Sequence, residues 1–516
     1  MFVGVSWSGA QEGNVRVALG AQGVQELSWR GHNFAQAEGD AGASSPEVGI
    51  TFRGEKTVRH DKPTETKLDR DGTLLQRFAW GDLRVRCNAE GNEVITSITV
   101  SNHTEQFIDQ VFCRLLDFGF PAAASPSGWG DSDPPKALAK EGPAALVARF
   151  GEGAVALVND PDANQVACRW GSRDRGAYPV FVESNLPIFP HEELSFQLEF
   201  CFGDRETPWP ELVRSVYARC REAHPFQVAW PDRRPIGSLF LAQVNRKWPG
   251  NPRGWFADPG LELRSEAGRD AFQRRLKDYA VQSITLLKEM NAQGMILWDL
   301  EGQEFPQGEA TYAGDPMQVA RLAPEMDGAA NAFFAAFSSA GFRTGVCLRA
   351  QEIVYRANGS FYQRDYRDEA ERFDGLDRKM SYAHQRWGCT LFYVDSNGGP
   401  HGVFPVEAFR RLQEKHPDCL ICPEFGFTPY WAYTMPYREL RRSAPWADVN
   451  STAPALVQVY PEGGSLINVA DGDIYDNFPR LVEGVRRGDI LLYRSWMRSR
   501  EFDDVKNIYR LAKRSQ

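Results

Sequence analysis

The sequence of 516 residues lacks the long apolar runs that membrane-spanning helices require. A helix needs about 20 consecutive, predominantly apolar residues to cross a bilayer, and no stretch of this chain approaches that length. The N-terminus has neither the basic cluster nor the apolar core of a secretory signal peptide. We therefore expect a cytoplasmic protein with no membrane partner; a truncated secretion signal is the alternative.

The sequence also lacks an excess of basic residues and the common nucleotide-binding motifs. A net charge of −9 and a pI near 5.6 argue against nucleic acid as the main partner. No phosphate-binding loop of the type GxxxxGKS/T is present, and no GxGxxG opens a helix after a first strand. The GxSxG motif of serine hydrolases is missing as well. These absences direct attention to chemistry that needs no nucleotide cofactor.

Cysteine and histidine are too scattered to indicate a metal site. The nine cysteines and eight histidines form no HExxH motif. Cys419 and Cys422 make the only CxxC, and they lie inside a predicted strand without a second pair. We expect buried free thiols there, and we predict neither a metal nor an organic cofactor.

Residues 1–206 are rich in short alternating apolar runs separated by turn residues, which is typical of a β-sandwich. The runs Leu83–Cys87 and Val94–Val100 flank the pair Gly91-Asn92. Tight hairpin turns need residues that tolerate a positive φ, so this pair predicts a β-hairpin. We expect one antiparallel β-sandwich domain over 1–206.

Residues 207–235 differ in character, because a helical run, Glu211–Ala223, is followed by a proline-punctuated linker. From 236 to 516 strand and helix patterns alternate, which indicates strand–helix units on a parallel sheet. The eight predicted strands are Ser238–Val244, Gly294–Asp299, Thr344–Arg349, Thr390–Asp395, Cys419–Glu424, Leu456–Tyr460, Ser465–Ala470 and Ile490–Ser495. Eight such units predict a multidomain chain whose 236–516 part is a (β/α)8 barrel.

Two predicted strands end in carboxylates that could act together. Thr390–Asp395 is a continuous apolar run that ends on Asp395, and the next strand ends on Glu424. The C-terminal strand ends of a barrel build the active site, and glycoside hydrolysis uses two carboxyl groups across one bond. Neighbouring strands lie about 4.8 Å apart, which favours the shorter carboxyl separation of a retaining mechanism. Asp395 is then the nucleophile, and Glu424, in apolar surroundings, is the acid and base.

Other side chains at or near strand ends are predicted to bind substrate. They are Trp298, Asp299, Glu301, Arg349, Tyr393, Asp448 and Trp496. Asp299 and Glu301 could accept hydrogen bonds from sugar hydroxyls. Trp298 could stack on a sugar or simply pack in the core. Arg349 could support the nucleophile or form an ion pair at the barrel mouth.

A β-sandwich before a (β/α)8 barrel, with Trp298-Asp299 and Tyr393-Val394-Asp395 at strand ends, resembles retaining α-glycoside hydrolases of the α-galactosidase type. The carboxylates on strands four and five resemble the α-N-acetylgalactosaminidase branches of that superfamily. This resemblance implies that Asp395 is the nucleophile and Glu424 the acid and base. Related α-galactosidases take the acid from strand six, which would give that role to Asp448 and leave Glu424 to bind substrate.

The sequence therefore predicts a glycoside hydrolase that cleaves an α-linked carbohydrate with retention of configuration. One alternative is a hydrolase of another linkage, either inverting or β-specific. Another is a carbohydrate-binding protein with a degenerate barrel, although such a protein would be expected to lose one of the paired carboxylates. The oligomeric state stays open, a homo-oligomer included, because fold and motif do not determine it.

Overall fold

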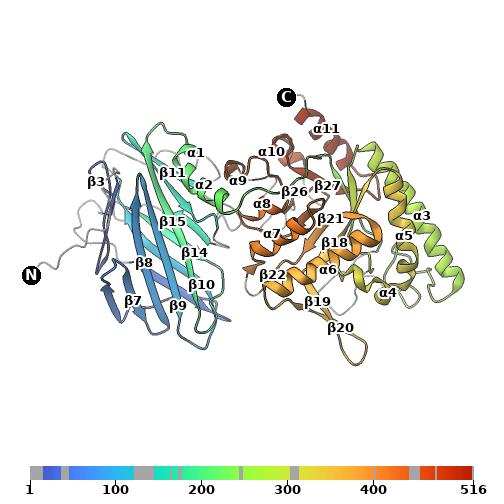
Figure 1. Ribbon diagram of the computed structural model, residues 1–516, viewed down its shortest axis with the longest axis horizontal. Coiled ribbons are helices and arrows are strands. Elements are labelled where there is room, and N and C mark those ends of the chain that lie inside the picture. The colour runs from blue at the N-terminus through green and yellow to red at the C-terminus, as the bar shows by residue number, and fades with distance from the viewer. Residues whose placement is uncertain are drawn as a thin grey trace, which may run out of the picture. The chain divides into compact units, whose positions relative to one another are not determined.

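The computed structural model describes residues 15–35, 46–120, 145–162, 166–171, 177–242, 248–302, 313–399, 402–440, 452, 454–470 and 474–513. The chain divides into two compact units (Figure 1). The first comprises Met1–Ala223 with the segments Pro400–Gly402 and Ala453–Val459. The second comprises His224–Gly399, Val403–Thr452 and Tyr460–Gln516.

The first unit is built from antiparallel sheets. Their strand orders are β11-β12-β15-β9-β8-β7-β6, β13-β14-β10-β4-β5 and β1-β2-β3. The strands are Val15–Gly20 (β1), Gly23–Trp29 (β2), His32–Asn33 (β3), Glu47–Phe52 (β4), Arg59–His60 (β5), Glu65–Leu68 (β6), Leu74–Phe78 (β7), Gly81–Glu90 (β8), Glu93–Asn102 (β9), Ile108–Phe118 (β10), Ala145–Phe150 (β11), Gly153–Asn159 (β12), Val166–Trp170 (β13), Tyr178–Ser184 (β14) and Glu193–Asp204 (β15). Many paired strands are consecutive in the sequence, such as β6 to β9, whereas β9 pairs with β15 and β4 with β10 across long stretches of chain.

The predicted hairpin is confirmed. β8 and β9 pair antiparallel, and Glu90 lies opposite Glu93, so that Gly91 and Asn92 form a two-residue turn. Gly91 has a φ of 58°. This left-handed conformation costs glycine little, because it has no side chain to clash with the backbone.

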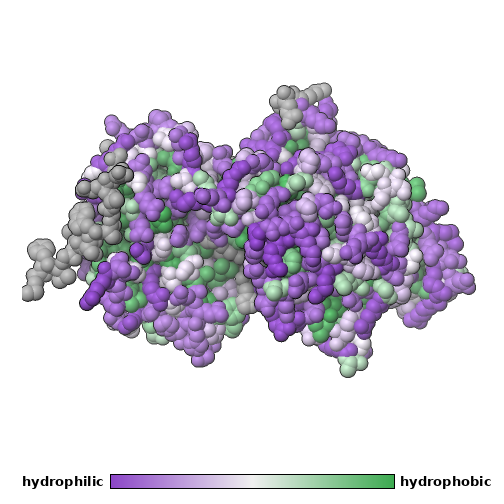
Figure 2. Space-filling view, in the orientation of Figure 1, coloured by the Kyte–Doolittle hydropathy of each residue, from purple (hydrophilic) through white to green (hydrophobic). Residues whose placement is uncertain are grey.

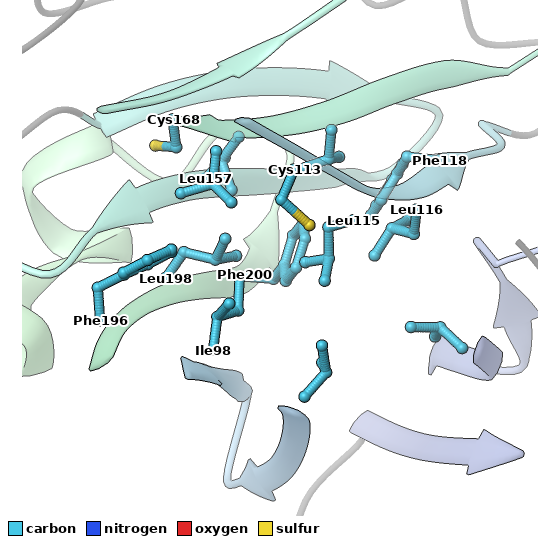
Figure 3. Close-up of a cluster of buried hydrophobic side chains, with 14 of the residues drawn as sticks. Ile98, Cys113, Leu115, Leu116, Phe118, Leu157, Cys168, Phe196, Leu198 and Phe200 are labelled. Carbon is cyan, nitrogen blue, oxygen red and sulfur yellow. The ribbon is translucent and has the colours of Figure 1, made fainter. Parts of the chain in front are cut away.

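The sandwich core is aromatic and aliphatic, which confirms the predicted architecture of this unit. Figure 3 shows Phe118, the last residue of β10, in one cluster with Leu198 and Phe200 of β15. The rings of Phe118 and Phe200 stack with centroids 5.8 Å apart. β10 and β15 belong to different sheets, so this apolar layer joins the two larger sheets.

Two helices follow the last sandwich strand, α1 (Trp209–Leu212) and α2 (Arg214–Ala223). Within the described residues, no helix has both the length and the apolar character to cross a bilayer. On the face seen in Figure 2, hydrophilic side chains predominate and apolar ones are scattered among them.

The second unit is a nearly closed barrel of eight parallel strands, as predicted. The order is β24-β21-β18-β17-β16-β27-β26-β25. The strands are Ile236–Leu239 (β16), Gly294–Leu297 (β17), Arg343–Arg349 (β18), Cys389–Asp395 (β21), Leu420–Pro423 (β24), Tyr437–Glu439 (β25), Leu466–Asn468 (β26) and Ile490–Arg494 (β27). β24 and β25 are the two edge strands of this order, and the Met435 amide, just before β25, donates to the Ile421 carbonyl of β24 at 2.9 Å.

Helices and two small hairpins surround these strands. The helices are Glu266–Glu289 (α3), Pro316–Gln318 (η1), Val319–Leu322 (α4), Pro324–Ser339 (α5), Glu369–Trp387 (α6), Val406–Lys415 (α7), Tyr430–Tyr433 (α8), Ile474–Arg487 (α10) and Glu501–Lys513 (α11). The hairpins are β19 (Gln351–Tyr355) with β20 (Phe361–Asp365) and β22 (Gly398–Gly399) with β23 (Gly402–Val403). α5 and α6 pack on β18, and α6 also packs on β21 (Figure 1).

The prediction for the sixth strand is wrong. Leu456–Tyr460 was expected as a strand, but Pro454–Val459 forms a helix, α9, and the sixth strand is Tyr437–Glu439. A short apolar run cannot be assigned to strand or helix by periodicity alone. The true strand has three residues, which is too short for any alternation to show.

The barrel interior explains why polar side chains meet at one end. Ile296 of β17, Leu391 and Tyr393 of β21, and Leu420 and Cys422 of β24 belong to one buried cluster inside the barrel. Side chains alternate along a strand, so the residue two positions after an inward-facing one also faces inward. The next inward positions at the carboxyl ends of β21 and β24 are therefore those of two carboxylates.

The glycine after α6 offers a test of backbone strain. Gly388 has a φ of 67° and caps the helix, and a Cβ there would meet nothing within 4 Å. We expect Gly388→Ala to lower the free energy of unfolding by about 1 kcal/mol through the backbone alone. The matched change Gly328→Ala, inside α5 and equally uncrowded, should raise it by up to about 1 kcal/mol. Urea unfolding measures the free energy of unfolding of both variants. A change of the same sign in the two variants would contradict the explanation.

Candidate active site

Asp395 and Glu424 lie next to each other at the ends of adjacent strands. In the pairing of β21 with β24, Tyr393 lies opposite Cys422 and Val394 opposite Pro423. The Glu424 amide donates to the Val394 carbonyl at 2.9 Å and extends this pairing. Asp395 is buried and Glu424 half-buried. The parallel register thus brings together the two carboxylates that the sequence pairs.

The surroundings of Glu424 favour its protonated form. Burial raises the pKa of Glu424 from 4.5 to about 8, with further contributions from the negative charge of Asp395 and from hydrogen bonding between the two carboxyls. The Ser396 amide, which donates to Glu424 Oε2 at 2.9 Å, and the nearby Arg349 act in the opposite direction. Near neutral pH, Glu424 therefore keeps its proton while facing Asp395.

Arg349, at the end of β18, supplies the positive charge of the site. Its Nη2 lies 2.8 Å from Asp395 Oδ2, and both side chains are largely buried. Its Nη1 donates to Gln363 of β20 at 3.5 Å. The Ser396 hydroxyl donates to Asp395 Oδ1 at 3.1 Å. Arg349 and Ser396 therefore occupy the two oxygens of Asp395, which orients this carboxylate.

A buried lysine holds the backbone around Arg349. Lys379 of α6 donates from Nζ to the carbonyls of Arg349, at 2.9 Å, and Gln351, at 2.7 Å. Its Nζ also lies 3.7 Å from Asp315 Oδ2. Burial lowers the pKa of Lys379, whereas Asp315 opposes that shift. On the other side, the Gly314 carbonyl accepts from the Arg349 amide at 2.7 Å, and a Cβ on Gly314 would lie 2.5 Å from that nitrogen.

The predicted aromatic residues form a layer inside the barrel. Trp298 lies between Phe240, at 5.5 Å, and Tyr393, at 4.9 Å. Tyr393 in turn contacts Tyr437 at 4.8 Å. Trp298 is only 6% exposed, so it packs in the core here. Since Tyr393 is the inward-facing residue directly before Asp395 on β21, this aromatic layer lies beneath the carboxyl pair and contributes to its apolar surroundings.

Trp496 lies at the edge of this aromatic layer. Its ring contacts Phe240 at 5.4 Å, and the Arg494 guanidinium lies 6.0 Å from its centroid. It is half-buried. A ligand above the aromatic layer could contact its exposed part, so its predicted role in substrate binding stays a prediction.

Asp299 and Glu301 hold loops together at the same end of the barrel. Asp299 is 0% exposed, and its oxygens accept from the amides of Leu241, at 2.9 and 3.1 Å, and Ala242, at 2.6 Å. Glu301 accepts from the Asp315 amide at 2.9 Å. In this structure both carboxylates bind backbone, and the predicted contacts with sugar hydroxyls stay predictions.

The sixth strand ends on a carboxylate that the sequence analysis did not single out. Asp448 lies outside the described residues, whereas the sixth strand ends on Glu439. Glu439 Oε1 accepts from the Tyr437 hydroxyl at 3.2 Å and from Asn468 Nδ2 at 3.1 Å, and Asn468 also donates to the Tyr437 hydroxyl at 2.7 Å. Asp448 as the acid of a strand-six mechanism stays a prediction, and Glu439 is a second carboxylate to consider for that role.

A cluster of potential metal ligands lies elsewhere in the described part of the chain. His384, Asp418 and Cys419 offer ligand atoms within 4.8 Å of one another. They lie by the start of β24, at the opposite end of that strand from Glu424. Burial raises the pKa of the Cys419 thiol, which disfavours the thiolate that binds metal. Cys419 and Cys422 are both buried free thiols, as predicted.

The described architecture defines a class: an antiparallel β-sandwich combined with a (β/α)8 barrel that has carboxylates at the ends of its fourth and fifth strands. Within this class the chain is similar in structure to the α-N-acetylgalactosaminidase NagBb from Bifidobacterium bifidum in complex with GalNAc. The TM-score is 0.55 at 12% identity, over 98% of this chain and 92% of that chain.

A quadruple mutant of the same enzyme gives a TM-score of 0.54 at 11% identity over the same shares of both chains. No protein-family model and no curated protein matches the sequence. At these identities the similarity establishes the fold. The expected resemblance to this branch of α-glycoside hydrolases is thus confirmed at the level of fold.

The raised pKa of Glu424 predicts a pH-dependent stability. A carboxyl that holds its proton more tightly when folded destabilises the fold as pH rises from its ordinary pKa of 4.5 to about 8. Glu424→Gln removes this effect. We expect the variant to gain stability over wild type between pH 5 and 8, reaching roughly 1–3 kcal/mol, since each pKa unit corresponds to about 1.4 kcal/mol before solvent screening.

Urea unfolding at several pH values measures this difference. Glu371→Gln is the control, because hydrogen bonds from Arg367 lower the pKa of Glu371 to about 2. The difference in stability between Glu371→Gln and wild type should therefore vary with pH only below about pH 5 and stay constant between about pH 5 and 8. A Glu424→Gln difference that stays constant from pH 5 to 8 would contradict the raised pKa.

Proposed function

We propose that this protein is a retaining glycoside hydrolase that cleaves an α-linked sugar. The observation that supports this most directly is the unequal carboxyl pair. The raised pKa of Glu424 keeps a proton on it near neutral pH, while the neighbouring Asp395 forms an ion pair with Arg349. A glycosidase needs one carboxylic acid and one carboxylate across the same bond.

In the first step, Asp395 attacks the anomeric carbon while Glu424 gives its proton to the leaving oxygen. This forms a covalent glycosyl-enzyme and releases the leaving group as an alcohol. In the second step, Glu424 takes a proton from water, and that water displaces Asp395 from the anomeric carbon. Glu424 thereby regains its proton and Asp395 its negative charge, so the pair is restored.

The closeness of the two carboxyls favours retention over inversion. An inverting enzyme keeps about 6.5–9.5 Å between its carboxyls to admit water, and a retaining enzyme about 5–5.5 Å. Here Asp395 and Glu424 follow adjacent, directly paired strands, and Asp395 is close enough to raise the pKa of Glu424. This closeness supports the shorter carboxyl separation of a retaining enzyme.

The similar enzyme NagBb was solved with GalNAc, which makes terminal α-linked GalNAc the first sugar to test. The aromatic layer offers an apolar surface beneath the carboxyl pair, and the guanidinium of Arg349 offers hydrogen-bond donors beside it. Both are compatible with the binding of a neutral sugar. A second linkage type has no specific observation in its favour.

The proposal is tested by turnover of α- and β-linked nitrophenyl glycosides, α-GalNAc among them. Wild type should cleave an α-glycoside. Asp395→Asn should lose activity by at least about 10⁴-fold, because the covalent step needs the carboxylate. Glu424→Gln should lose about 10²–10⁴-fold on natural glycosides, the usual contribution of general acid catalysis, and far less on activated nitrophenyl substrates.

Glu439→Gln is the matched comparison, since it makes the same change on strand six. It should keep the wild-type preference between activated and natural substrates. If Glu439→Gln instead shows the selective loss on natural glycosides, the acid belongs to strand six. Sugar binding without any turnover would favour the carbohydrate-binding alternative.

A further inference from the structure

The side chain of Asn397 joins the loops that follow β21 and β24. Asn397 Oδ1 accepts from the Phe425 amide at 2.8 Å, and Asn397 Nδ2 donates to the Phe425 carbonyl at 2.7 Å. The regular pairing of the strands has already ended, with the Glu424 amide bound to Val394. The asparagine side chain thus takes the place of a further backbone partner for Phe425.

The backbone around Asn397 is held on several sides. The preceding Ser396 has a φ of 55°, which an L-residue rarely adopts without support. Its carbonyl accepts from Gln351 Nε2 at 3.0 Å, and the Asn397 carbonyl accepts from the Phe404 amide at 3.0 Å. Asn397 is 0% exposed, so water cannot replace its contacts with Phe425.

Asn397 and Phe425 are close to the carboxyl pair through the chain itself. Asn397 is two residues after Asp395, and Phe425 is the residue after Glu424. Between them, Ser396 donates from its amide to Glu424 and from its hydroxyl to Asp395. A movement of Phe425 relative to Asn397 would therefore act on the backbone that carries both carboxyls.

Such a change matters for the chemistry. A retaining glycosidase keeps its carboxyls within a narrow range, about 5–5.5 Å, and a misplacement of about 1 Å can cost on the order of 10²-fold in rate. Both burial and the closeness of Asp395 keep the proton on Glu424. A looser loop would admit water and weaken both effects.

We propose that Asn397 is a positioning residue that sets the separation of Asp395 and Glu424 by clamping the backbone of Phe425. Its catalytic consequence rests on the proposed glycosidase function. Asn397 touches no reacting atom in this assignment. It acts through Phe425 on Glu424 and through the chain on Asp395.

The variant Asn397→Ala removes both contacts with Phe425. We expect kcat on an unactivated α-glycoside to fall by about 10²-fold, with KM changed less than threefold. Hydrolysis of the matching α-glycosyl fluoride, whose leaving group needs little acid assistance, should fall by less than about tenfold. The alkaline side of the pH profile of kcat should move to lower pH, because the pKa of Glu424 returns toward its ordinary value.

Asn102→Ala is the matched control. Asn102 is also 0% exposed, donates to the carbonyls of Gln106, Ile188 and Phe189, and belongs to the first unit. Its loss should lower the unfolding temperature without changing the ratio of the two substrate rates or the pH profile. If Asn397→Ala behaves in the same way, its role is structural and the proposal is overturned.

A second measurement does not depend on turnover. Titration of glutamate side chains labelled with ¹³C at the carboxyl carbon, with Glu424→Gln to identify the signal, gives the pKa of Glu424 directly. We expect a value near 8 in wild type and a value at least one unit lower in Asn397→Ala. An unchanged pKa in a folded Asn397→Ala variant contradicts the positioning role. A lowered pKa in a protein that cleaves no glycoside supports it while rejecting the proposed function.

Discussion

The site depends on one constraint: two carboxyl groups in contact, in surroundings too apolar to hold two negative charges. Burial and the neighbouring Asp395 hold a proton on Glu424 near neutral pH, and Arg349 forms an ion pair with Asp395. Like charges at this distance interact strongly where water is scarce. The proton and the guanidinium together make the pair stable enough to exist in a folded protein.

The rest of the barrel can be understood as support for this pair. Inward-facing aromatic residues, Trp298 and Tyr393 among them, fill the interior below it and keep water away from that side. Lys379 holds the backbone at Arg349 from behind. Asp299 fixes the loop after β16. Each of these polar groups is bound to backbone atoms of a neighbouring loop, so the carboxyl ends of several strands form one connected layer.

Several of these features could be predicted from the sequence because they depend on local chemistry. The continuous apolar run before Asp395 indicates a buried strand, and the acid at its end indicates a functional position. Gly91 with Asn92 predicts a hairpin because few residues accept a positive φ. The roles of Asp299 and Glu301 could not be read in this way, because a carboxylate that binds backbone amides has the same sequence signature as one that binds a sugar.

The sequence by itself determined the order of sandwich and barrel, seven of the eight barrel strands, and the choice of Asp395 and Glu424 as a pair. These follow from patterns that a strand or a turn imposes on its own residues. Only the tertiary structure decided that Glu439 ends the sixth strand, that Arg349 reaches Asp395, and that Asn397 joins the loops after β21 and β24. Such contacts link residues that are distant in the chain, and the distances between them follow from barrel closure and strand register, which no local pattern encodes.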